Sequence, residues 1–187
     1  MSALHWKQSL ALVVLLLGMA MRPSAAQPDS PSEESQVKAA FLYKFAGYVE
    51  WPDGFLGPVQ TPFTIGVLGA DAIADELAHI VQGRKSQSRS VAVRRFKAGD
   101  PLEDMAILFV GKGDAARLKP LRNTLQGRPI LVVTEEPTGL AHGAMINFLL
   151  VDRHVRFEVS LDPVEKSGLR LSSRLLAVAQ KVHAEGR

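Results

Sequence analysis

The sequence contains no cysteine among its 187 residues, which excludes disulfide bonds, a thiol switch and zinc sites built on cysteine. It also lacks a large excess of either charge, because 22 lysines and arginines stand against 19 aspartates and glutamates. The basic residues between Arg84 and Arg95 are therefore interpreted as a solvated loop and strand face, and nucleic-acid binding is not expected. The apolar stretch from Leu10 to Met21 is shorter than the roughly 20 residues that span a bilayer.

This apolar stretch has the layout of a secretory signal peptide. Lys7 precedes it and small residues follow it, so we expect cleavage after Ala26 and removal of residues 1–26. Loss of Lys7 and Arg22, the charged residues of that segment, lowers the formal net charge from +3 to +1. No cysteine follows the cleavage site, which excludes a lipoprotein anchor, and the mature protein is expected in the periplasm. The alternative, a buried helix of the domain, is disfavoured because no polar face interrupts the run.

Residues 27–36 form a polar leader, and residues 37–183 have the composition of one globular domain. A helix is predicted over residues 31–50, with Ser30 as its N-cap, and it must end near Trp51 because Pro52 follows. Its apolar residues recur at three- and four-residue spacing. They are Val37, Phe41, Phe45, Tyr48 and Val49.

Short β-rich runs then alternate with helical ones, which is typical of a parallel sheet. The predicted elements are strands over 63–68, 91–96, 106–110 and 130–134, and helices over 72–82 and 114–126. In the last third we expect an antiparallel hairpin of residues 145–151 and 154–160, a short helix over 162–167, and a final helix from Ser172 to Val182. The prediction is thus a single α/β domain, with a mostly parallel sheet of about four strands, an added C-terminal antiparallel hairpin, and about five flanking helices.

No catalytic motif is complete in the sequence. The glycines at 66 and 69 and at 111 and 113 follow predicted strands, but neither set completes a phosphate-binding loop. Ser35-x-x-Lys38 resembles one signature of penicillin-binding enzymes, whose third signature is absent. The histidines occur singly, so no metal site is predicted. We expect no enzyme, no cofactor and no metal, and interpret the chain as an exported binding domain.

The segment VKAAFLYKFAGYVEWP, residues 37–52, resembles the opening helix of the YfiR-like family of exported regulators. Later blocks resemble the same family in the same order. They are FTIGVLG at 63–69, ILFV at 107–110, ILVVT at 130–134, GAMINF at 143–148, VRFEV at 155–159 and GLRLSSRLL at 168–176. The resemblance covers roughly Val37 to Val182.

This resemblance implies a periplasmic inhibitor of an inner-membrane diguanylate cyclase or a related sensor kinase. In the family's best-known arrangement, the regulator binds the cyclase's periplasmic sensor segment, lowers cyclic-di-GMP synthesis, and is itself restrained by an outer-membrane lipoprotein. A homodimer is a further alternative for the partner. Well-known relatives have cysteines linked to activity, whereas the nearby positions here hold Met105, Ala106, Leu140 and Asn147, so redox control by that route is excluded. The alternative is a periplasmic small-molecule sensor with a pocket at the carboxyl ends of the parallel strands.

Four residues are candidates for partner binding. Ile146, Glu158 and Val164 lie on the terminal hairpin and the turn after it, and alternation points Glu158 away from the strand's apolar side chains. They could form a small apolar patch with one charge; alternatively, Ile146 and Val164 are core residues and Glu158 is solvated. Trp51 is interpreted either as a core anchor or as a partner contact.

Overall fold

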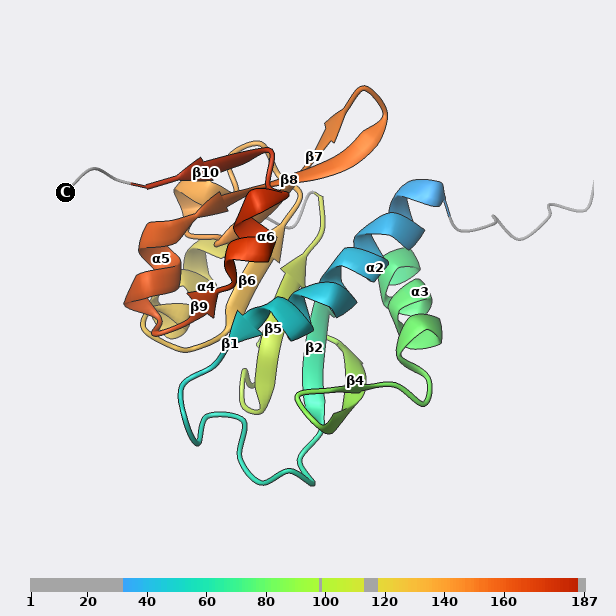
Figure 1. The fold of residues 1–187 in the computed structure, drawn as a ribbon, viewed down its shortest axis with the longest axis vertical. Helices are drawn as coiled ribbons and strands as arrows, with labels where there is room; N and C mark the ends of the chain where they lie inside the picture. Colours follow the sequence, from blue (N-terminus) through green and yellow to red (C-terminus); the bar gives the residue numbers. More distant parts are fainter. Residues whose placement is uncertain (1–31, 98, 113–117, 185–187) are drawn as a thin grey trace, which may run out of the picture. The chain divides into compact units, whose positions relative to one another are not determined.

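The computed structural model describes residues 32–97, 99–112 and 118–184 (Figure 1). The predicted signal peptide, residues 1–26, and the leader as far as residue 31 lie outside this part of the chain, so their processing stays a prediction. Within the described residues, no helix has both the length and the apolar character that a membrane span requires.

The first described helix, α2, spans Glu33–Tyr48. Its N-cap is Ser32, whose side chain accepts the Ser35 N–H at 3.2 Å, so the prediction of Ser30 as the cap is wrong. The observed start places two glutamates in the first turn, where the helix dipole favours negative charge. The helix ends two residues earlier than predicted because Val49 is already extended and pairs with Leu171, joining β1 (Val49–Glu50) to β9 (Arg170–Leu171).

The buried face of α2 differs in part from the prediction. Its buried residues are Lys38, Ala39, Leu42, Phe45 and Ala46. Phe41 and Phe45 pack on Phe157 of the hairpin, with ring centroids 5.6 and 5.3 Å away. Tyr48, predicted on the apolar face, is exposed. The aromatic cluster therefore fixes α2 against the hairpin end of the sheet.

The main sheet has eight strands, so the prediction of about four parallel strands plus a hairpin is too small. In spatial order they are β10 (Lys181–His183), β8 (His154–Ser160), β7 (Ile146–Val151), β6 (Leu131–Thr134), β5 (Met105–Val110), β2 (Phe63–Leu68), β4 (Arg89–Arg95) and β3 (Lys85–Ser86). Five of them, β4, β2, β5, β6 and β7, run parallel to one another. The mostly parallel α/β character is confirmed, and the additional strands are pieces of two or three residues at the edges.

The helices cover both faces of this sheet. The helix α3 (Asp71–Val81) packs beside α2 on one face, and α4 (Leu118–Leu125) lies on the other (Figure 1). Two buried clusters result, and each contains alternate residues of the central strands. The chain reverses its direction of winding between β2 and β5, which in open α/β sheets is the usual place for a ligand crevice.

The C-terminal third contains the predicted hairpin. β7 and β8 pair over six residue pairs, and both turn residues, Asp152 and Arg153, have positive φ, as in the two-residue turn that matches strand twist. Two short helices follow, α5 (Leu161–Lys166) and α6 (Ser173–Ala177). With α2, α3 and α4 they make five α-helices in the described part, as predicted. The final helix is shorter than expected, however, because Val182 lies on β10, which pairs with β8.

Candidate functional site

Two of the three residues predicted to form a partner patch lie in the core. The exposed fractions are 0% for Ile146 and 2% for Val164, and both belong to the hydrophobic cluster beneath α2. The expectation of an exposed apolar patch at these positions is therefore wrong, and the alternative, that both are core residues, describes this structure. That Ile146 and Val164 contribute to partner binding stays a prediction. Because both side chains are buried, they would contribute by shaping the core and not by touching the partner.

Glu158 points away from the apolar face of β8, as alternation predicted, but its carboxylate has two partners. It accepts a hydrogen bond from Asn147 Nδ2 at 3.0 Å and pairs with His183 Nε2 at 2.8 Å. Its side chain is 16% exposed. The carboxylate thus ties β8 to β7 and to the edge strand β10, and a small part of it remains open to solvent.

Sequence reasoning missed the polar row to which Glu158 belongs. Thr134, Asn147 and Glu158 are register neighbours on β6, β7 and β8. Thr134 and Asn147 are fully buried, and Thr134 Oγ1 and Asn147 Oδ1 have no hydrogen-bond partner within the described residues. A Cβ on Gly139 would lie 2.1 Å from Thr134 Cγ2, so only glycine fits beside the row. The sequence signal for this row was one of these polar residues in each of the three predicted strands.

Trp51 lies at the corner between α2 and the loop that leads to β2. Its ring meets the ring of Phe63 edge-on, with centroids 5.0 Å apart, and it packs half-buried against the main hydrophobic cluster. The indole Nε1 is buried without a hydrogen-bond partner in the described residues. These contacts support the core-anchor interpretation, while a partner contact by Trp51 stays a prediction.

A cleft of about 390 Å³ opens beside this corner. Its walls include Glu50, Trp51 and Asp53 on one side and Gln87 and Arg89 on the other. The Arg89 guanidinium donates to the carbonyl oxygens of Gly57, Pro58 and Thr61, in the loop before β2. These hydrogen bonds hold that wall in place. This cleft lies at the amino end of β2, where the chain enters the sheet.

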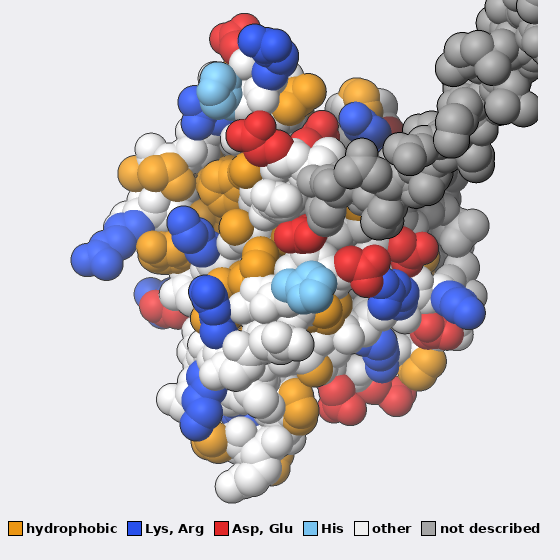
Figure 2. All heavy atoms as spheres, turned by 90° about the vertical axis from the view of Figure 1, so that its right-hand side faces the viewer, with side chains coloured by type: hydrophobic (Ala, Val, Ile, Leu, Met, Phe, Trp, Pro, Cys, Tyr) orange, Lys and Arg blue, Asp and Glu red, His pale blue; other side chains and the backbone are white. Residues whose placement is uncertain are grey.

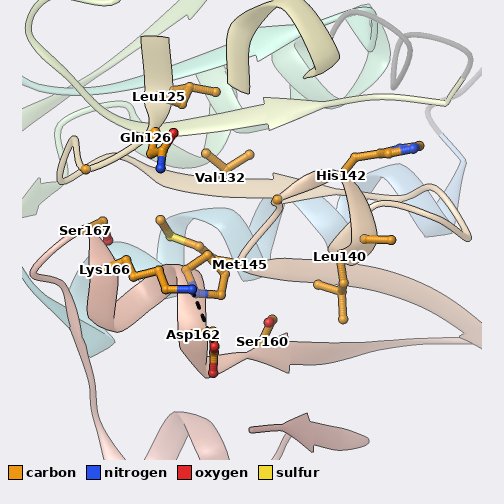
Figure 3. Close-up of a pocket in the computed structure, with 14 residues that line it drawn as sticks. Leu125, Gln126, Val132, Leu140, His142, Met145, Ser160, Asp162, Lys166 and Ser167 are labelled. Atoms are coloured by element: carbon orange, nitrogen blue, oxygen red, sulfur yellow. Dashed lines mark ion pairs between the residues drawn. The ribbon is translucent and has the colours of Figure 1, made fainter. Parts of the chain in front are cut away.

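A second cleft, of about 280 Å³, lies between α5 and the end of α4 (Figure 3). Val132, Leu140 and Met145 form an aliphatic floor, and a loose ion pair of Lys166 Nζ and Asp162 Oδ2, 3.6 Å apart, crosses one side. This cleft is close to the amino ends of β6 and β7. Neither cleft is at the carboxyl ends of the parallel strands, where the small-molecule alternative placed a pocket.

At the carboxyl ends, described residues of the protein contact one another. Glu135, which follows β6, accepts the Lys112 N–H at 3.0 Å and the ammonium group of Lys38 on α2. A Cβ on Gly111 would lie 2.5 Å from the Gly69 carbonyl oxygen, so the turns after β5 and β2 touch. A backbone N–H that could receive a ligand anion thus binds an internal carboxylate.

Burial and pairing act in opposite directions on Lys38. Burial by itself lowers the pKa of Lys38, but hydrogen bonds and charge interactions with Glu135 and Glu34 outweigh burial and raise the pKa. The hydrogen bond from Lys38 lowers the pKa of Glu34. The side chains of Lys38 and Glu135 are 6% and 10% exposed. This cluster links α2 to the ends of β5 and β6.

Arg84 and Arg95, at the two ends of the basic stretch, both contact neighbouring side chains of the protein. The Arg95 guanidinium pairs with Asp71 at 3.0 Å and also with Asp75, and Arg84 lies over the ring of Tyr43, 5.6 Å from its centroid. Figure 2 shows acidic and basic side chains interspersed over the face that it displays. These exposed contacts connect the stretch to α3 and α2.

The described residues assemble no cluster of three or more His, Asp or Glu side chains that could hold a metal ion. The polar side chains described above have structural contacts: they form buried ion pairs, cap a helix and link neighbouring strands. A model of the YfiR/HmsC-like family matches residues 35–180, which is most of the chain and includes α2, both clefts and the hairpin. That family is regulatory rather than catalytic, and membership is consistent with a regulator of diguanylate cyclase signalling. The match over residues 35–180 shows that this chain belongs to the YfiR/HmsC-like family.

Proposed function

We propose that this protein is a periplasmic negative regulator, which binds the periplasmic sensor segment of an inner-membrane diguanylate cyclase and lowers cyclic-di-GMP synthesis. The family match over residues 35–180 carries the proposal. A predicted signal peptide at residues 1–26 supports the periplasmic location, where the cyclase's sensor segment is accessible. An outer-membrane lipoprotein that restrains the regulator would complete the arrangement.

The arrangement of the site favours a binder of proteins. At the carboxyl ends of β5 and β6, the edge of the sheet where many α/β proteins bind small ligands, Glu135 is bonded to Lys38 and to the Lys112 N–H. A regulator needs a surface with different affinity for the partner's two states, because it shifts an equilibrium only through differential binding. Glu158 keeps its place as a partner candidate, since it is charged, partly exposed and on the terminal hairpin.

Cells that lack the gene test the function directly. Deletion is expected to raise cellular cyclic-di-GMP, and the wild-type gene is expected to restore the lower level. Glu158→Gln keeps an oxygen acceptor for Asn147 but removes the charge, so it should accumulate in the periplasm and restore repression only in part. Glu103→Gln, at an exposed turn residue, is the matched control and should repress fully. An unchanged cyclic-di-GMP level in the deletion strain would show that the proposed function is wrong.

Direct binding gives the second measurement. The purified periplasmic segment of the same organism's diguanylate cyclase should bind the mature protein in calorimetry, and Glu158→Gln should weaken that binding while Glu103→Gln does not. Repression without any measurable contact would exclude the direct inhibitor and favour an indirect pathway.

A further inference from the structure

The outer half of the terminal hairpin forms a two-stranded ribbon, residues 148–157, whose pairing partners in the described chain are mostly its own. On the β7 side, β6 pairs with Ile146 and Asn147 and goes no further. On the β8 side, β10 pairs with residues 158–160 alone. In Figure 1 the hairpin accordingly projects beyond the rest of the sheet. The outer edge of β8 is thus open over His154–Arg156 within the described part.

The turn geometry fixes which backbone groups face this open edge. In a two-residue hairpin the pair next to the turn, Val151 and His154, exchanges hydrogen bonds, and the bonded pairs then alternate along the strands. Val155 and Phe157 therefore direct their backbone groups outward. The Phe157 carbonyl oxygen already accepts the Gln180 N–H at 2.8 Å, which marks the end of the covered part of the edge. Phe157 is 1% exposed, so its N–H is covered as well, and the N–H and C=O of Val155 remain for another strand.

Exposed apolar side chains gather around the same edge. Five large hydrophobic side chains of the described chain are exposed, and three of them are Leu150, Val178 and Val182. Leu150 is on the ribbon, Val182 is on β10, and Val178 precedes by two residues the Gln180 that borders the open stretch. Exposed apolar groups beside unpaired strand edges mark places where another chain adds.

The charge of the ribbon selects the partner's chemistry. Arg153, His154 and Arg156 are exposed, and Lys181 is exposed on the neighbouring β10. Asp152 is the one acidic side chain of residues 148–157. A strand with acidic residues toward Arg156 and apolar residues toward Val178 would complement both faces of the open edge.

We infer that an extended segment of the partner, with alternating acidic and apolar residues, adds as a strand to the outer edge of β8 at His154–Arg156. This inference deepens the proposed function and rests on it. Main-chain hydrogen bonds to the N–H and C=O of Val155 give the docking its register, and the flanking side chains give its specificity.

Amide hydrogen exchange, residue by residue, tests this placement. The mature protein is measured alone and with a saturating amount of the purified periplasmic segment of the same organism's diguanylate cyclase. Exchange at Val155 should slow at least tenfold on binding, while its neighbours His154 and Arg156, already bonded to β7, should change little. This alternation is a signature of strand addition that side-chain docking alone does not produce.

A charge reversal supplies the second arm. Arg156→Glu should lower the affinity for the cyclase segment at least tenfold at low salt, and the matched control Arg128→Glu, also exposed, should not. Binding without the alternating protection would overturn the inference and leave the proposed function standing. Protection of Val155 that increases with the protein's own concentration would identify a second copy as the occupant and overturn it too. Failure of the cyclase segment to bind at all would overturn both.

Discussion

Lys38→Met is expected to destabilise the fold although it replaces a lysine on a helix by a good helix former. The substitution leaves the Glu135 carboxylate 10% exposed and without its cation. Breaking a buried ion pair by removing one partner typically costs about 3 to 5 kcal/mol. Glu135 keeps the Lys112 N–H as a donor, so we expect the lower end of this range, a loss of about 3 kcal/mol of unfolding free energy.

A double-mutant cycle separates the pair from simple packing. Glu135→Gln alone should cost less, since its amide oxygen can still accept from Lys112 and Lys38 keeps Glu34. The combination of Lys38→Met with Glu135→Gln removes both charges, and it should cost at least about 1 kcal/mol less than the two single changes together. Urea unfolding of the mature protein, followed by the fluorescence of Trp51, measures all three. Additive effects, or a Lys38→Met variant as stable as wild type, would refute the reasoning.

The same cluster predicts a pH dependence at both ends. The pKa of Glu34 is lowered below 4.5 mainly by its hydrogen bond from Lys38, so its contribution to stability is present above that value and is lost as the pH falls through the lowered pKa. The pKa of Lys38 is raised above 10.5, so its contribution is complete below that value and is lost as the pH rises through the raised pKa. Lys38→Met should flatten both limbs of the stability profile, and an unchanged profile would contradict the assignment.

Three other outcomes are expected. Trp51→Ala should lower the unfolding free energy by about 3 kcal/mol through loss of its contact with Phe63, measured by urea unfolding followed by circular dichroism; a stable variant that no longer binds partner would favour the contact interpretation. Gly139→Ala should cost about 1 to 3 kcal/mol because its Cβ has no space, whereas Gly47→Ala, in an open helical position, should be neutral or stabilising; equal melting temperatures would contradict this. Protein isolated from the periplasm should begin near Gln27, and an intact mass that includes Lys7 would exclude cleavage.

Elements with a strong local pattern could be predicted from the sequence. The strand over 63–68 and the hairpin strand over 154–160 have the predicted bounds, because apolar runs or strict alternation end at clear turn residues. Short pieces could not be found in this way. β1, β3, β9 and β10 have two or three residues each, and their extended conformation depends on partners distant in the sequence.

In the candidate site too, features set by local pattern could be predicted, and contacts between distant segments could not. Alternation assigned Glu158 to the correct face of its strand, yet its partner His183 arrives on β10, from a segment that was predicted as helix. The ion pair of Lys38 was not predicted, because nothing local reveals that Glu135 lies at the end of a strand 97 positions away. The buried states of Ile146 and Val164 depend on how α2 and α5 close over the sheet, which pattern alone does not determine.

Backbone hydrogen bonds at the ribbon edge supply too little free energy to hold a partner by themselves. Two backbone hydrogen bonds at about 1 kcal/mol each give about 2 kcal/mol, whereas a micromolar complex needs about 8 kcal/mol after the cost of association. Apolar burial beside the edge must supply the rest, and Val178, 65% exposed, is the most exposed large apolar side chain there. Val178→Ser should therefore weaken binding of the cyclase segment about tenfold without changing the melting temperature. Val59→Ser, of similar exposure at 57% but in the loop before β2, should bind as wild type does. Equal calorimetric affinities of the two variants would show that the partner docks away from this edge.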